Sequence, residues 1–158
     1  MAAPERPDDT LQDASAPELT QAVTRGLTRA LRQLGQSVLT EVALRNGRRA
    51  DVMALDRAGH FTIYEVKVTT ADFLGDGKWP DYADYCDRLY FAVPLSFPLD
   101  LLPEDCGVMV ADAYGAEEIR PAPDEPLHAS RRKALTLQFA RTAAERLCQM
   151  RQEGEEEG

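Results

Sequence analysis

Apolar and polar residues follow two different periods along the chain, and the helical period is clearest near the start. Over residues 15–35, apolar and small side chains recur every three or four positions and fall on one stripe of a helix. Ser15 and Glu18 have the spacing of a capping box, and Gly35 stands where a C-terminal cap is expected. We therefore predict an amphipathic helix over this segment.

Strand-like patterns follow the first helix. Three candidate strands span residues 37–44, 48–56 and 60–69. The turn signals Asn46-Gly47 and Arg57-Ala58-Gly59 separate them, so we expect an antiparallel meander.

The second half of the chain continues to alternate between the two patterns. Trp79 and the Pro80 that follows it are typical of a helix start, and we expect this helix to run to about Asp87. Residues 88–93 and 107–111 have the pattern of strands, and a second long amphipathic helix is predicted over residues 130–151. Because both long helices can cover a sheet, the order predicts an α/β fold with a mixed central sheet flanked by helices.

The two ends differ from the middle in composition. Residues 1–16 are rich in Pro, Ala and Asp without apolar periodicity, and residues 152–158 read QEGEEEG, so we expect both to be disordered tails. With 158 residues, 44% of them hydrophobic, the chain can bury one core and is too short for two. We therefore expect a single domain over residues 17–151.

The net charge of −9 is unfavourable for binding a polyphosphate, since a stand-alone nucleic-acid binder usually carries the opposite sign. It indicates a weak or partner-assisted DNA binder. No apolar run suits a signal peptide or a membrane span, so we expect a soluble, cytoplasmic protein without a membrane partner. The GDGK string at residues 75–78 lacks the spacing of a phosphate loop, so we expect no nucleotide cofactor.

Candidate chemistry lies in the second and third predicted strands. In HFTIYEVKV, residues 60–68, Glu65 and Lys67 share one face because side chains alternate along a strand. Asp51 interrupts an otherwise apolar strand next to it. Burying such a charge costs several kcal/mol unless it is paired or bound to a metal.

Two interpretations of these residues are open. In the first, Glu65 and Lys67 lie on a solvated face and Asp51 only pairs with Lys67. In the second, Asp51 and Glu65 supply oxygen ligands to Mg²⁺ or Mn²⁺, and water and a substrate phosphate complete the coordination. Lys67 would then orient the attacking water and offset charge in the transition state.

The order of elements, together with Ala50-Asp51 and Glu65-Val66-Lys67, resembles the PD-(D/E)XK nuclease superfamily, although Ala50 stands where the motif nominally has Pro. This resemblance implies a restriction-endonuclease-like αβββαβ core with an added C-terminal helix. It also implies catalytic roles for Asp51, Glu65 and Lys67. Such sites often contain a third carboxylate, for which Glu18 and Glu41 compete. We prefer Glu41, because the capping box already accounts for Glu18.

Lys78 and Tyr82 have a K-x-x-x-Y spacing that is similar to the Q-x-x-x-Y element of RecB-type nucleases, with Lys78 keeping a donor for phosphate. Longer strings, such as GRRADVMAL at residues 47–55, are similar to the MmcB family of bacterial DNA-repair proteins. This similarity extends over about residues 17–150 and implies a nuclease-like domain in DNA repair.

We therefore expect a divalent-metal-dependent deoxyribonuclease that hydrolyses phosphodiester bonds. The alternative is a catalytically silent nuclease-fold module that binds DNA or a repair protein. Two basic clusters are candidates for phosphate contact, although solvation of a surface would explain them equally well: Arg48 and Arg49 near the first turn, and Arg131 and Arg132 at the start of the last helix.

Overall fold

The computed structural model describes residues 14–77 and 79–158. Most of the predicted N-terminal tail, residues 1–13, lies outside the described residues, as does Lys78.

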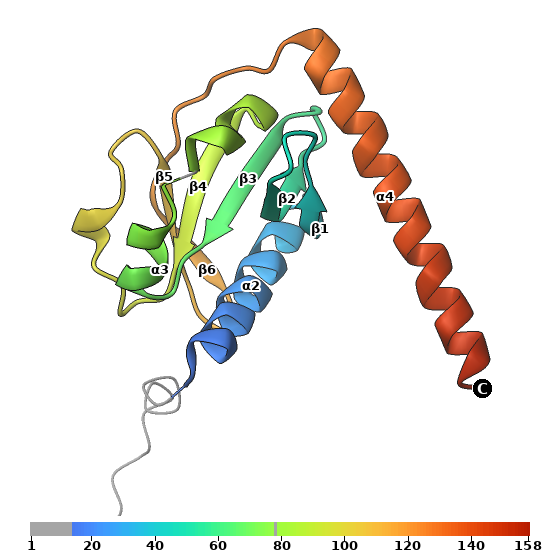
Figure 1. Ribbon diagram of the computed structural model, residues 1–158, viewed down its shortest axis with the longest axis horizontal. Helices are drawn as coiled ribbons and strands as arrows, with labels where there is room; N and C mark the ends of the chain where they lie inside the picture. The colour runs from blue at the N-terminus through green and yellow to red at the C-terminus, as the bar shows by residue number, and fades with distance from the viewer. Residues whose placement is uncertain (1–13, 78) are drawn as a thin grey trace, which may run out of the picture.

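A six-stranded mixed sheet forms the centre of the molecule, and its strands lie in chain order (Figure 1). The first three strands are antiparallel, which confirms the predicted meander, and β3, β4 and β5 run parallel to one another. The last strand is antiparallel to β5 and was not predicted from the sequence. The strands are β1 (Ser37–Ala43), β2 (Arg49–Leu55), β3 (Phe61–Val66), β4 (Arg88–Val93), β5 (Gly107–Ala111) and β6 (Ala116–Arg120).

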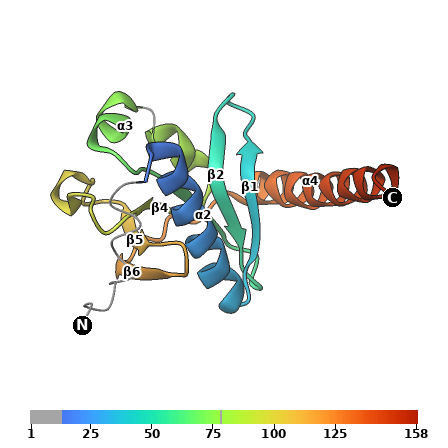
Figure 2. The ribbon, with the colours of Figure 1, turned by 90° about the horizontal axis from the view of Figure 1, so that it is seen from below.

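Helix α2 (Ala16–Gln33) covers one face of the sheet (Figure 2). Its N-terminus is capped as predicted, since the backbone N–H of Glu18 donates to Ser15 Oγ at 3.4 Å. The buried stripe of α2 packs against side chains from β2, β3 and β4. Gly26 lets the helix approach the β5–β6 turn closely, because a Cβ at this position would lie 1.7 Å from the carbonyl oxygen of Asp112.

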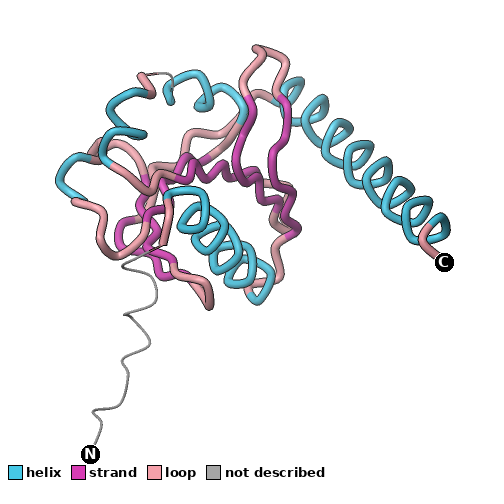
Figure 3. The backbone as a smooth tube through the Cα atoms, turned by 60° about the horizontal axis from the view of Figure 1, so that its bottom comes forward, coloured by secondary structure: helices cyan, strands magenta, loops and turns pink. Residues whose placement is uncertain are grey.

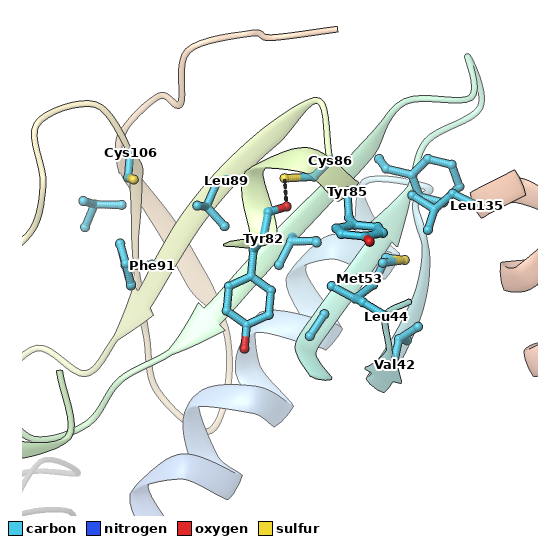
Figure 4. Close-up of a cluster of buried hydrophobic side chains, with 14 of the residues drawn as sticks. Val42, Leu44, Met53, Tyr82, Tyr85, Cys86, Leu89, Phe91, Cys106 and Leu135 are labelled. Carbon is cyan, nitrogen blue, oxygen red and sulfur yellow. Dashed lines mark hydrogen bonds between the residues drawn. The ribbon is translucent and has the colours of Figure 1, made fainter. Parts of the chain in front are cut away.

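The opposite face of the sheet is covered by short helices (Figure 3). These are α3 (Thr70–Gly75) and the 3₁₀ helices η1 (Trp79–Tyr85) and η2 (Leu99–Leu101). Figure 4 shows part of the apolar cluster beneath them, in which Tyr82, Tyr85 and Phe91 pack together. The helix predicted from Trp79 is thus a 3₁₀ helix, and α3 was not predicted at all.

Helix α4 (Ala129–Glu156) differs from its prediction in two ways. It continues past Arg151 to Glu156, so most of the acidic end that we expected to be disordered is helical. Only its first part packs on the sheet, through Leu135 and Phe139, whereas Leu147 is 52% exposed. The expectation that both long helices cover the sheet is therefore wrong for most of α4, which projects beyond the sheet (Figures 1 and 2).

Polar contacts to the edge strand explain the position of α4. Arg146 donates to the carbonyl oxygens of Thr40 and Glu41 at 2.6 and 2.9 Å, and Gln138 donates to that of Ala43. The helix therefore satisfies carbonyl groups of the exposed edge of β1. No described helix is long and apolar enough to cross a membrane.

Candidate metal and phosphate site

Two carboxylates meet where β2 and β3 stop pairing, and we call this place the fork. The strand ladder runs as far as the pair Val52 and Tyr64. Beyond it, the backbone N–H of Asp51 donates to Glu65 Oε1 at 3.2 Å, and that of Val66 donates to Asp51 Oδ2 at 2.8 Å. Each carboxylate thus accepts a backbone hydrogen bond from the opposite strand, and the two side chains lie between the strands.

The fork is electrostatically unfavourable for two negative charges. Glu65 is only 2% exposed, and its burial, followed by the nearby charge of Asp51, raises its pKa to about 9. Burial also raises the pKa of Asp51, although its hydrogen bonds oppose the shift. A cation between the two carboxylates would favour their ionised forms, because it would replace the missing positive charge.

Lys67 extends from the same strand, two residues beyond Glu65, and is buried. Its Nζ donates to Asp76 Oδ2 at 2.7 Å and lies 4.0 Å from Asp72 Oδ1. Among the described residues the ion-pair partners of Lys67 are thus acids of the α3 segment, not Asp51. Burial lowers the pKa of Lys67, but the hydrogen bond to Asp76 and the charges of Asp72 and Asp76 outweigh it and raise the pKa overall.

Tyr82 of η1 closes the site from the other side. Its hydroxyl donates to the carbonyl oxygen of Arg49 at 3.2 Å, and burial, followed by the charges of Glu65 and Asp51, raises its pKa to about 12. Tyr82 is only 7% exposed, so it has little surface for stacking on a base.

An open groove of about 880 Å³ lies between α2 and the ends of β1 and β2 and reaches Asp51. Glu65 and Lys67 are buried and do not line it. The sheet side of the groove is formed by Thr40, Glu41, Asp51 and Val66. The helix side is formed by Thr20, Gln21, Thr24, Arg25, Thr28, Arg29, Arg32 and Gln33.

The two candidates for a third carboxylate occupy different places. Glu41 lines the groove with Asp51 and has a positive φ of 50°, a conformation that costs about 1 kcal/mol or more and is often found at functional sites. Its side chain is 68% exposed and lies 3.8 Å from Arg49. Glu18 is not among the residues that line the groove.

The basic candidates are mostly engaged in contacts within the protein. Arg48 pairs with Asp81 at 3.0 Å, and the guanidinium of Arg131 lies 4.5 Å from the centre of the Tyr85 ring. The partly exposed Arg132 forms an ion pair with the buried carboxylate of Asp87, which gives it a structural role. Lys78 lies outside the described residues.

The residues at the fork suit a small divalent cation. Among residues 14–77 and 79–158, no three His, Cys, Asp or Glu side chains gather into a metal-ligand set. Mg²⁺, however, is usually held by one or two carboxylates and fills its other positions with water and substrate phosphate. Asp51 and Glu65 meet that requirement in number, in oxygen chemistry and in their need for positive charge.

Two groups of residues at the site were missed from the sequence. Asp72 and Asp76 are not among the candidates from the sequence, yet both face Lys67. The Thr69-x-x-Asp72 spacing is a capping signal, and it fixes Asp72 because its N–H donates to Thr69 Oγ1 at 3.0 Å. The arginines at positions 25, 29 and 32 were also missed, although their spacing places them on one face of a helix.

Comparison with known proteins shows the family and a similar fold. The family described as DNA repair protein MmcB-like matches residues 7–154. The chain belongs to the MmcB-like DNA repair family. Its fold is also similar to that of the SPO1766 protein of unknown function from Silicibacter pomeroyi, with a TM-score of 0.81 and 42% identity over 88% of this chain and 93% of that one. No curated protein is significantly similar to this MmcB-like chain.

Proposed function

We propose that this MmcB-like protein is a divalent-metal-dependent deoxyribonuclease that hydrolyses phosphodiester bonds in DNA repair, within the PD-(D/E)XK superfamily. The observation that carries the proposal is the fork, where the half-buried Asp51 and the buried Glu65 lie side by side and the charge of Asp51 adds to burial in raising the pKa of Glu65 to about 9. Membership of a DNA repair family supports DNA as the substrate.

Each residue at the fork has a distinct role in this proposal. Asp51 and Glu65 would hold Mg²⁺ or Mn²⁺, which polarises the scissile phosphate and lowers the pKa of a bound water. Lys67, fixed by Asp76, would orient the attacking water and offset negative charge on the phosphate. Tyr82 would limit solvent access from the η1 side, because its ring is buried beside both carboxylates.

The experiment is a cleavage assay on single-stranded, duplex, nicked and branched DNA with Mg²⁺ or Mn²⁺. We expect the wild-type protein to cut at least one substrate, and Asp51→Asn and Lys67→Ala each to lose at least about 100-fold in rate. Asp84→Asn, which alters an exposed carboxylate of η1, is the matched control and should cut normally. Cleavage that persists in both site variants would refute the assignment.

A second candidate function is a silent module that binds DNA or a repair protein, and one contact favours it. Lys67 is engaged by Asp76 at 2.7 Å, a contact that could serve folding alone. This candidate predicts no cleavage of any substrate and no thermal stabilisation by Mn²⁺, together with recovery of a specific repair protein in a pull-down.

A further inference from the structure

Three arginines of α2, Arg25, Arg29 and Arg32, line the groove that leads to Asp51, and we call them the α2 arginine row. We propose that this row is the track that binds the sugar-phosphate backbone of DNA and guides one strand to the fork. The inference rests on the proposed function, which it extends by naming the surface that holds the substrate.

The spacing of the row suits a single nucleic-acid strand. The arginines are separated by four and three positions, which places them on one face of the helix. At a rise of about 1.5 Å per residue, the row extends over about 10.5 Å along the helix axis. A DNA strand advances about 3.4 Å per nucleotide, so the row matches about three consecutive nucleotides.

The row is also free to bind a ligand. All three arginines are exposed, and within the described residues none of them has a carboxylate within 4.0 Å. Other arginines of the protein are paired in this way, including Arg48 with Asp81 and Arg132 with Asp87. The remaining helix side of the groove carries only threonine and glutamine, which are neutral hydrogen-bonding side chains.

The row resolves the conflict between a net charge of −9 and a DNA substrate. An acidic surface repels DNA, so a local group of unpaired arginines determines where the backbone binds. The groove joins this group to Asp51, so a strand held by the arginines would run toward the Asp51 side of the fork. An acidic protein segment would also be attracted to the arginines, but it has no phosphate that a metal ion at the fork could bind.

The test is the affinity of the full-length protein for fluorescent single-stranded and duplex DNA, measured by anisotropy in EDTA at several salt concentrations. EDTA prevents metal-dependent cleavage, so binding is observed alone. Each phosphate contact contributes about 0.7 (single strand) to 0.9 (duplex) to the slope of log affinity against log salt. We expect the triple variant R25A/R29A/R32A to reduce the slope by about two to three and to bind at least about 10-fold more weakly at low salt.

The matched control is R57A/R141A/R151A, which removes the same charge from exposed arginines outside the groove. It should retain the wild-type slope. R25K/R29K/R32K should restore most of the binding, since a phosphate needs only a positive charge, and this rescue separates lost contacts from a folding defect. Equal losses in the two alanine triples would overturn the proposal, as would tighter binding of polyglutamate than of DNA.

The experiments distinguish a failure of the proposed DNA track from a failure of the nuclease proposal. If the wild-type protein binds DNA through the row but never cleaves it, the track is supported and the nuclease proposal fails. If it cleaves DNA and the R25A/R29A/R32A variant binds and cleaves as the wild type does, the nuclease proposal is supported and the track is refuted.

Discussion

Two carboxylates of this protein are equally buried and have opposite electrostatic surroundings. Asp87 and Glu65 are each 2% exposed. Asp87 accepts hydrogen bonds from the backbone N–H groups of Phe61 and Leu127 and from both terminal guanidinium nitrogens of Arg132. Burial raises the pKa of Asp87, but these contacts outweigh it and lower the pKa to about 2. At Glu65, burial and the charge of Asp51 raise the pKa to about 9.

This difference in electrostatic surroundings marks Asp87 as a structural carboxylate and Glu65 as a candidate functional one. The chain itself supplies every partner of Asp87, so this carboxylate joins β3, the segment before α4 and α4. The fork supplies backbone donors and a second carboxylate, and the ammonium group of Lys67 is hydrogen-bonded to Asp76. A buried group whose surroundings disfavour its charge is a candidate for ligand binding or catalysis.

Breaking the ion pair between Asp87 and Arg132 should change the free energy of unfolding most. Replacing Arg132 with Ala leaves Asp87 buried with its charge uncompensated, so we expect the free energy of unfolding to fall by about 3–5 kcal/mol. Urea unfolding monitored by circular dichroism measures this value. R141A, on the exposed side of α4, should change stability by less than about 0.5 kcal/mol. A loss below about 1 kcal/mol for R132A would show that the ion pair with Arg132 is not needed to stabilise the buried Asp87.

Replacing the carboxyl group of Glu65 should instead raise the free energy of unfolding. At pH 8 the unfolded chain has an ionised Glu65 that must take up a proton on folding, because its pKa rises to about 9. Glu65→Gln removes this cost and keeps an amide oxygen that can accept from the Asp51 N–H, so we expect a gain of about 1–3 kcal/mol without metal. The same urea experiment applies. Glu104→Gln, at an exposed glutamate, is the control and should be neutral. Destabilisation by Glu65→Gln would mean that the ionised carboxylate serves the fold.

The two groups should also give opposite slopes of stability against pH. Glu65 has a raised pKa, so its contribution is fully present below about pH 4.5, its usual value, and is lost as the pH rises through about 9. Asp87 has a lowered pKa, so its contribution is present above its usual value of 3.8 and is lost as the pH falls through about 2. Unfolding measured from pH 2 to 9 should show both trends.

Variants test which group is responsible for each trend. Glu65→Gln should flatten the profile between about pH 5 and 9, and Asp87→Asn should flatten it only below about pH 4. An unchanged alkaline slope in Glu65→Gln would assign that trend to another group.

The smallest effect on stability is expected from substitutions at the acidic partners of Lys67. Asp76→Asn removes the hydrogen-bonded charge that raises the pKa of Lys67, so that pKa should fall. Stability should fall by less than in R132A, because the Asp72 carboxylate stays 4.0 Å from Lys67 Nζ and still offsets its charge. If the protein cleaves DNA, the alkaline limb of its rate profile should move to lower pH. Asp72→Asn should act more weakly, since its carboxylate lies 4.0 Å away. Equal shifts would contradict the geometry.

The sequence predicted those helices and strands whose pattern of apolar and polar residues lies within a single segment. Helix α2, the β1–β2–β3 meander, β4 and β5 were predicted because their periodicity and turn residues lie within each segment. The proximity of Asp51 to Glu65 followed from the hairpin. Short elements such as α3 and β6 have too few residues to show a period.

Contacts between residues far apart in the sequence account for the other differences between the predictions and the structure. Asp87 and Arg132 are 45 positions apart, so neither residue indicates the other in the sequence. The apolar stripe of α4 predicts an amphipathic helix, but it does not show whether a partner covers the stripe. Arg146 and Gln138 decide that outcome by binding the edge of β1.

The central claim is that Asp51 and Glu65 form a divalent-cation site, and isothermal titration of Mn²⁺ into the metal-free protein at pH 7 tests it most directly. Titrations in two buffers of different ionisation enthalpy report the protons released. Because the pKa of Glu65 is raised to about 9, Glu65 is mostly protonated at this pH and must lose its proton to bind the ion. We predict that the wild-type protein binds Mn²⁺ with release of about one proton, and that Glu65→Gln binds much more weakly without this release. Absence of binding, or equal binding by both proteins, would contradict the claim.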